Sequence, residues 1–316
     1  MKKGLWMLGL AAAAMTSCTQ SEVLEVAENR AIGFESFVGK STRVVSDLAT
    51  DNNFTKFFVY GSYDNGSSSY VDVYDGEYVS KETGSWVNEK LQYWVNGKDY
   101  KFAAYSDGND ELTSGVTFTD ATGILEIADY VVGTKDLIAV DKVSQTGLAS
   151  SNDKVTLTFN HLLSKVKFTF STTFGTHLTV TVTDLTVKQV ENKGTWNGTQ
   201  WTPSVPSVTA DKSYDASGLV ATSAGKESEE CYVLPQSNTD LKASFTVTVT
   251  DEGNNTIAQK TFSDVSLASG SDNKWVDGYA YNYKATITPA NMGANPIEFN
   301  PSVSSWKNED VNVTIP

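Results

Sequence analysis

Arginine is nearly absent from this chain of 316 residues, because it occurs only at Arg30 and Arg43. Lysine, in contrast, is spread along the whole length. An arginine-specific protease could therefore cut the chain only near its start. The segment that ends at the second arginine has a near copy at the other end, since residues 32–38 read IGFESFV and residues 297–303 read IEFNPSV.

The two segments share isoleucine, phenylalanine and valine at the same offsets: Ile32, Phe34 and Val38 in the first, and Ile297, Phe299 and Val303 in the second. In a β-strand, positions i, i+2 and i+6 point to one face. The two segments are therefore predicted to present the same apolar face to the same groove. The alternative is that any two amphipathic strands of a β-sandwich look alike.

Histidine is as rare as arginine, and its two residues alone could act as acid or base near neutral pH without a large pKa shift. His161 stands where the alternation of a strand breaks and is expected to satisfy hydrogen bonds at a strand corner, whereas His177 lies in a turn. The sequence has no cysteine–histidine metal spacing, no Gly-x-Ser-x-Gly motif and no phosphate-binding loop. It therefore predicts no enzyme, no cofactor and no metal site.

Three other features have ordinary explanations. The turn at residues 107–111 (Asp-Gly-Asn-Asp-Glu) offers oxygens for calcium but lacks the rest of a calcium loop. The acidic run at residues 227–230 is typical of a solvated face. Trp196 and Trp201 flank the turn Asn-Gly-Thr-Gln and could stack on a sugar ring, although tryptophans in hairpins more often pack across strands.

Cysteine occurs only at Cys18 and Cys231. Residues 1–17 form an export signal with two lysines at its start and an apolar run too short to span a bilayer. A small residue before Cys18 is typical of a lipoprotein signal in which this cysteine is lipidated; the alternative is an ordinary signal peptide cut near Ala14. With Cys18 lipidated, Cys231 has no partner and the exported protein has no disulfide framework.

The net charge is −14 and the isoelectric point is about 4.6. An acidic chain repels phosphate backbones, which argues against nucleic acid as a partner. After residue 18, no apolar stretch approaches the length of a transmembrane helix. Attachment to a membrane would therefore depend on the lipid.

Apolar and polar residues alternate along the rest of the chain, in runs rich in threonine, valine and aromatic residues. Clusters of turn-forming residues separate these runs, and no helical period exceeds about three turns. The pattern predicts an all-β chain of antiparallel sandwiches, and the length suggests two domains that meet near residues 174–176. The runs are at residues 57–60, 155–159, 166–170, 178–182, 185–187, 245–249 and 279–287.

Several segments occur together in a particular order after the lipoprotein signal. They are Trp94…Tyr100-x-Phe-x-Ala-Tyr105, Asp136-Leu-Ile-Ala139, Phe159-x-His-x-Leu-x-Lys-Val166, Val233-Leu-Pro-Gln236, Tyr281-x-Tyr283 and Val303…Trp306. Each segment is unspecific alone, but together and in this order they resemble the fimbrillin (Mfa-like) family of type V pilus proteins. The resemblance covers nearly the whole chain.

This resemblance implies two tandem transthyretin-like antiparallel β-sandwich domains, which we expect at residues 44–175 and 176–316. It also implies transport to the outer membrane as a lipoprotein carrying palmitate on Cys18. An arginine-specific protease is then expected to cut after Arg43 and release the propeptide at residues 18–43, with its first strand of Ile32, Phe34 and Val38. Arg30 is the alternative cleavage site, although a cut there would leave the strand in place.

Strand exchange between subunits would follow, with copies of this chain or other fimbrillins joined head to tail in an extracellular fimbrium. The donor strand is expected within residues 297–316, with the side chains of Ile297, Phe299, Val303, Trp306, Val311, Val313 and Ile315. We expect a subunit of the pilus shaft. The alternatives are a tip or anchor subunit, or a monomeric surface lipoprotein that binds a glycan or a protein. The sequence leaves open which ligand on host or bacterial cells the protein would adhere to.

Overall fold

The structure is a computed structural model that describes residues 31–38, 54–113, 115–147, 154–214, 218–268 and 273–305. Regular structure in these residues is almost entirely β-strand, and the helix among them is the single turn α2 (Pro289–Met292). The predicted all-β class is thus confirmed, while the transthyretin-like topology stays a prediction. No helix in this part of the chain has the length and apolarity that a membrane span needs.

The first sheet has seven strands in the order β1-β9-β8-β5-β2-β3-β4. Strand β1 runs parallel to β9, and the other neighbouring strands are antiparallel. The bounds are β1 (Phe34–Val38), β2 (Lys56–Gly66), β3 (Ser69–Glu82), β4 (Ser85–Asn88), β5 (Asp99–Asp107), β8 (Leu137–Thr146) and β9 (Val155–His161).

Both faces of this sheet are covered. On β2, Phe57 and Val59 belong to one core cluster, whereas Phe58 between them belongs to another. The first half of β2 reads as a continuous apolar run, because neither of its faces meets water there. The second cluster lies between the sheet and a four-stranded sheet of order β13-β12-β7-β6. Its bounds are β6 (Val116–Thr119), β7 (Ile124–Val131), β12 (Lys193–Trp196) and β13 (Trp201–Pro203).

The second half of the chain forms a β-sandwich, in which two sheets enclose one core. Phe168 and Tyr283 from one sheet meet Val182 and Phe245 from the other in this core. One sheet consists of β10 (Ser164–Thr172), β16 (Lys226–Glu227), β17 (Cys231–Val233), β22 (Tyr279–Ile287) and β23 (Asn300–Ser305). The other consists of β11 (Thr179–Glu191), β14 (Thr209–Ser213), β15 (Leu219–Ala221), β19 (Lys242–Thr250) and β20 (Thr256–Ser266), and a separate pair is formed by β18 (Gln236–Ser237) and β21 (Lys274–Trp275).

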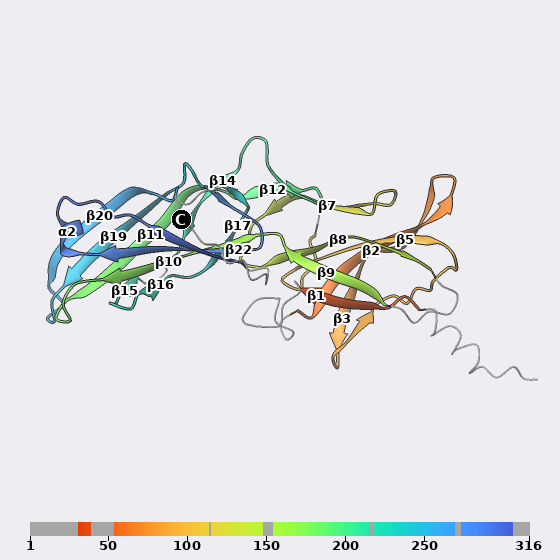
Figure 1. Cartoon of the computed structure of the whole chain (residues 1–316), viewed down its shortest axis with the longest axis horizontal. Helices are drawn as coiled ribbons and strands as arrows, with labels where there is room; N and C mark the ends of the chain where they lie inside the picture. The colour runs from red at the N-terminus through yellow and green to blue at the C-terminus, as the bar shows by residue number, and fades with distance from the viewer. Residues whose placement is uncertain are drawn as a thin grey trace, which may run out of the picture.

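The molecule is elongated, with the seven-stranded sheet at one end and the sandwich at the other (Figure 1). The chain passes from the first sheet to the second between β9 and β10, at residues 162–163. The predicted boundary near residue 175 therefore falls after β10, and it stays a prediction. The hairpin of β12 and β13 returns to the first unit, where Lys193 pairs with Val131. The two units are thus tied together by more than one chain crossing.

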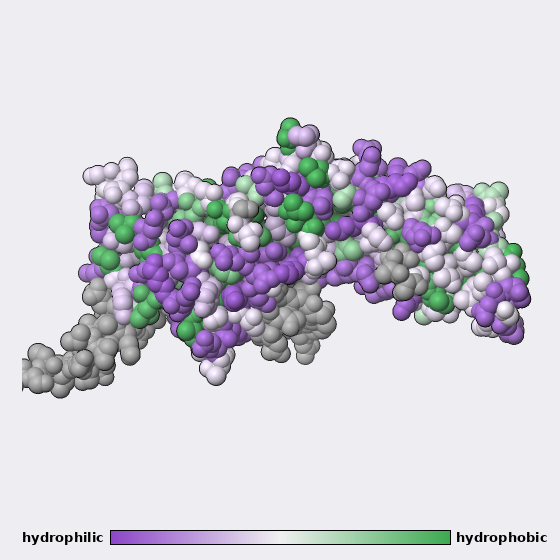
Figure 2. Space-filling model, turned by 180° about the vertical axis from the view of Figure 1, so that it is seen from behind, coloured by the Kyte–Doolittle hydropathy of each residue, from purple (hydrophilic) through white to green (hydrophobic). Residues whose placement is uncertain are grey.

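Most of the surface seen in Figure 2 is polar, and hydrophobic residues form small groups, the clearest of them near the middle of the molecule. This distribution fits the acidic, charged composition of the chain. Small, separated groups are normal on a protein surface and need no partner of their own.

Candidate functional site

Strand β1 lies at one edge of the seven-stranded sheet. It pairs in parallel with β9, from Phe34 opposite Val155 to Val38 opposite Phe159. The backbone N–H of Val155 donates a hydrogen bond to the carbonyl oxygen of Gly33 (2.8 Å). One side of the segment at residues 31–38 is thus held by an ordinary strand ladder.

The start of this segment is held from a different direction. Ala31 forms an isolated bridge with Tyr93, and the N–H of Ile32 donates to the carbonyl oxygen of Gln92 (2.8 Å). The Asn88 side chain donates to the carbonyl oxygen of Ile32 (2.7 Å). Residues 31–38 therefore fill a gap between β9 and the segment at residues 88–93, and we call this gap the β1 slot.

The side chains of Ile32 and Phe34 fill the core behind the β1 slot, and each is only 1% exposed. The ring centroid of Phe34 lies 5.5 Å from that of Tyr74, 5.9 Å from Phe102 and 6.1 Å from Phe57. Burial of a large apolar side chain stabilises a fold by about 1.5–3 kcal/mol, so these two contribute about 3–6 kcal/mol together. The side chain of Val38 lies outside the described residues.

Four exposed apolar side chains lie along residues 87–95, the segment that holds the start of residues 31–38, and we call them the exposed strip. Its members are Val87, Leu91, Tyr93 and Val95, which are 42%, 55%, 41% and 39% exposed. Trp94 between the last two is buried at 1% exposure, as strand-like alternation requires. The strip therefore places apolar surface beside the place where β1 enters.

The C-terminal segment has an equivalent place in the sandwich. Ile297 and Phe299 are both 7% exposed and belong to the sandwich core. The ring centroid of Phe299 lies 5.2 Å from that of Phe168 and 5.9 Å from that of Phe245. Strand β23, which follows, pairs antiparallel with β22 at a sheet edge, and its Val303 is 36% exposed.

The structure therefore places the two matching segments in two separate cores, each as the piece that seals its own unit. Ile32 and Phe34 come together in the first unit, and Ile297 and Phe299 come together in the second. The other predicted site residues lie outside the described residues: Cys18, Arg30, Arg43, Trp306, Val311, Val313 and Ile315.

Asn88 and Gln92, which hold the start of the β1 slot, were not identified from the sequence. Gln92 contributes only its backbone carbonyl, which any residue would offer. Asn88 stands at the end of β4, 56 positions from the residue that it binds. No spacing in the sequence connects residues at that separation.

Each of the two histidines lies beside one acidic side chain. His161 is buried, and its Nδ1 lies 2.9 Å from a carboxylate oxygen of buried Asp136. His177 is exposed and lies 2.7 Å from Glu252. The described residues contain no group of three or more histidine, cysteine or acidic side chains that could hold a metal ion.

The turn at residues 107–111 is also built into the fold. The Asn109 side chain accepts hydrogen bonds from the backbone N–H groups of Thr55 (2.8 Å) and Lys56 (3.0 Å). Burial raises the pKa of Asp107 above its ordinary value, although a hydrogen bond from the Tyr130 hydroxyl (3.2 Å) acts in the opposite direction. This turn anchors the start of β2.

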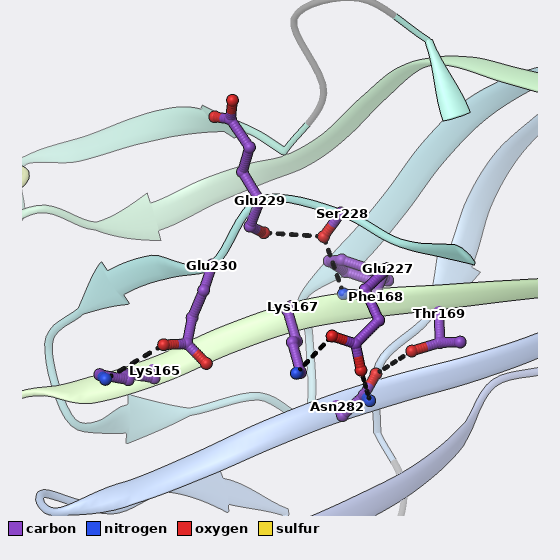
Figure 3. Close-up of polar contacts among 9 residues, drawn as sticks. All are labelled: Lys165, Lys167, Phe168, Thr169, Glu227, Ser228, Glu229, Glu230 and Asn282. Carbon is purple, nitrogen blue, oxygen red and sulfur yellow. Dashed lines mark hydrogen bonds and ion pairs between the residues drawn. The ribbon is translucent and has the colours of Figure 1, made fainter. Parts of the chain in front are cut away.

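The acidic run at residues 227–230 is exposed, yet it makes specific contacts with β10 (Figure 3). Glu230 lies 3.1 Å from the buried ammonium group of Lys165, and Glu227 lies 2.8 Å from the partly exposed ammonium group of Lys167. Between them, the Ser228 hydroxyl accepts a hydrogen bond from the backbone N–H of Phe168 (2.9 Å). These contacts fasten β16 and β17 along one edge of β10.

Comparison with known proteins identifies the family of this chain and several solved structures with a similar fold. A family described as fimbrillin-like matches residues 42–306. None of the curated proteins matches the sequence.

Three solved structures share the fold. A fimbrial protein of Bacteroides vulgatus is 17% identical, with a TM-score of 0.66, over 88% of this chain and 99% of that one. A candidate cell adhesion protein of Bacteroides uniformis is 20% identical, with a TM-score of 0.53, over 87% of this chain and 98% of that one. A further candidate cell adhesion protein, from Bacteroides ovatus, is 15% identical, with a TM-score of 0.55, over 89% and 99% of the two chains.

Proposed function

Because the chain belongs to the fimbrillin-like family, we propose that it is a structural subunit of a cell-surface pilus, placed in the shaft. The observation that carries this proposal is the position of β1, an edge strand whose side chains complete a core but whose ladder has a single partner strand. The similar structures of a fimbrial protein and of candidate cell adhesion proteins support the proposal.

The precursor is exported, lipidated on Cys18 and carried to the outer membrane. An arginine-specific protease then cuts after Arg43, which lies between the end of β1 at Val38 and the start of β2 at Lys56. A cut at this position removes the covalent link between β1 and the rest of the sheet. A cut after Arg30 precedes the whole of β1 and would leave it attached.

Loss of β1 exposes the apolar slot and the free edge of β9. Such an edge is a template for another strand, and the slot requires new apolar side chains. The exposed strip at residues 87–95 adds apolar contact area beside it. A strand donated by a neighbouring subunit fills the slot, and repeated donation produces an open head-to-tail filament.

The C-terminal segment supplies the donor strand in this proposal. Ile297 and Phe299 are core residues of their own sandwich, so their transfer would empty one core in order to fill another. A donor that begins after Ser305 avoids this cost of about 3–6 kcal/mol. We therefore place the main donor side chains at Val311, Val313 and Ile315, which alternate as an inserted strand requires.

The test is replacement of Arg43 by alanine, with Arg30→Ala as the matched control, followed by N-terminal sequencing of protein from the cell surface. We expect the control to start at Val44 and to form polymers that resist unheated gel electrophoresis. We expect Arg43→Ala to remain monomeric with β1 attached. Normal filaments built from Arg43→Ala subunits that retain β1 would refute the maturation step.

The same measurement separates the alternatives. Uncut, lipid-attached monomers in the unaltered protein would favour a monomeric surface lipoprotein. Cut protein found only at one end of a filament of other subunits would favour a tip or anchor role.

A further inference from the structure

A groove of about 610 Å³ opens between the hairpin of β12 and β13 and the β18–β21 pair. It lies far along the chain from the β1 slot, and the proposed strand exchange does not use it. Its volume falls within the range of about 300–1,000 Å³ that small-molecule sites occupy. Residues from both sides line it, among them Gln200, Trp201, Gln236, Asn273, Lys274 and Asp277.

Trp201 forms a fixed aromatic wall of this groove. Its indole N–H donates a hydrogen bond to the carbonyl oxygen of Leu162 (2.6 Å), and the ring centroid of Tyr130 lies 5.7 Å from its own. The residue is half-buried, so part of the ring remains accessible. Trp196, its cross-strand partner, is only 4% exposed and supports the hairpin from within.

The turn of the hairpin is fixed by its own first residue. The Asn197 side chain accepts hydrogen bonds from the N–H groups of Thr199 and Gln200 (both 3.1 Å) and from the Thr199 hydroxyl (3.0 Å). Thr199 and Gln200 are exposed and line the groove next to the Trp201 ring. The backbone that carries the exposed Gln200 side chain is therefore ordered beside the Trp201 ring.

The opposite wall is also ordered. The Gln236 side chain accepts from the N–H of Glu191 (2.9 Å) and donates to the carbonyl oxygen of Leu234 (3.1 Å). Asn273 and Asp277 stand on the same wall, together with one lysine. The Gln236 amide also donates to the carbonyl oxygen of Glu191 (3.3 Å), so both of its N–H groups are used within the fold. Asn273, Lys274 and Asp277 therefore supply the donors and acceptors across the groove from Trp201.

We propose that this groove binds a neutral oligosaccharide. The C–H face of a sugar ring packs on an aromatic surface, while amide and carboxyl groups exchange hydrogen bonds with its hydroxyls. The single cation, Lys274, is balanced by the single anion, Asp277, so the groove has little to attract a phosphate or another strongly charged ligand. Both walls are preformed, which reduces the entropy lost on binding.

The experiment titrates the full chain with four probes: N-acetyllactosamine, cellotriose, maltotriose and an acidic control, trigalacturonic acid. Saturation-transfer NMR detects which sugar protons contact the protein, and the tryptophan fluorescence gives the affinity. We expect at least one neutral probe to bind through its ring C–H protons. Gln200→Ala and Trp201→Leu should each weaken that binding about tenfold or more. Val205→Ala, at a 96% exposed position in the loop after β13, is the matched control and should leave it unchanged.

Gln200 is exposed, so its variant tests the groove even if Trp201→Leu unfolds the hairpin. The proposal is overturned if no neutral probe binds at tens of millimolar, or if only the acidic probe binds. It is also overturned if a bound probe keeps its affinity in Gln200→Ala.

Discussion

Removal of β1 should destabilise the first unit of the molecule and leave the sandwich unchanged. A chain that begins at Val44 loses the side chains of Ile32 and Phe34, which are 1% exposed in the intact protein. The loss of about 3–6 kcal/mol is a large part of the 5–15 kcal/mol that ordinarily stabilises a folded domain. Scanning calorimetry should therefore show two transitions, one shifted to lower temperature and one at the position of the full chain.

A peptide supplied in trans tests whether the slot is specific. Residues 31–38 added as a free peptide should raise the lower transition again, because they restore both the ladder on β9 and the buried side chains. The same peptide with Phe34→Ala should fail, since a phenylalanine truncated in a core costs about 3–5 kcal/mol. A peptide with Glu35→Ala is the matched control and should act like the natural one, because the hydrogen bond of the Glu35 side chain with Thr156 is exposed to solvent.

This reasoning has a clear point of failure. A chain starting at Val44 that unfolds in one transition, at the temperature of the full chain, would show that β1 does not complete the core. Equal rescue by the natural peptide and the Phe34→Ala peptide would show that the slot does not recognise the aromatic side chain.

Three further predictions concern the rest of the fold. Phe299→Ala should lower the free energy of unfolding of the sandwich by about 3–5 kcal/mol in urea titrations, whereas Val303→Ala, at a 36% exposed position, should cost under about 1 kcal/mol. His161→Ala should cost about 1–3 kcal/mol because it removes the hydrogen-bond partner of a carboxylate oxygen of buried Asp136, and the double replacement with Asp136→Ala should cost less than the two single losses combined. Burial raises the pKa of Asp107, so its ionisation costs the folded state stability as the pH rises through that pKa. Asp107→Asn should therefore be more stable than the unaltered protein at pH 7, and this gain should fade as the pH falls and vanish well below 3.8, where the carboxyl is protonated in both states.

The strands were largely predictable because their signal is local. The alternation at residues 279–287 corresponds to β22 (Tyr279–Ile287), and the run at residues 245–249 lies inside β19. Each such run records only which face of its own strand is buried. The return of the hairpin at residues 193–203 to the first unit was not predictable, since β12 pairs with a strand that lies more than 60 positions earlier.

The candidate site was predictable in part for the same reason. The spacing of Ile32 and Phe34 indicates two side chains that point into one groove, and the structure buries both. The spacing of Ile297 and Phe299 also indicates two side chains that point into one groove, but it does not identify which groove they occupy. The structure shows that this pair fills the core of its own sandwich. The likeness of the two segments therefore reports a shared packing role, and it does not by itself identify donor and acceptor.

Residues 32–38 and 297–303 have equivalent packing roles, and the positions of the arginines distinguish them. Arg30 and Arg43 flank residues 31–38, and no arginine follows them anywhere in the chain. An arginine-specific cut can therefore release the piece that seals the first unit, but it cannot release the piece that seals the sandwich. Under the proposed cleavage, each subunit gains one open slot and keeps one closed core, which is what growth in a single direction requires. An arginine introduced into the loop that leads to Ile297 would remove this difference between the ends, and cleavage there would be expected to cost the subunit its stable sandwich.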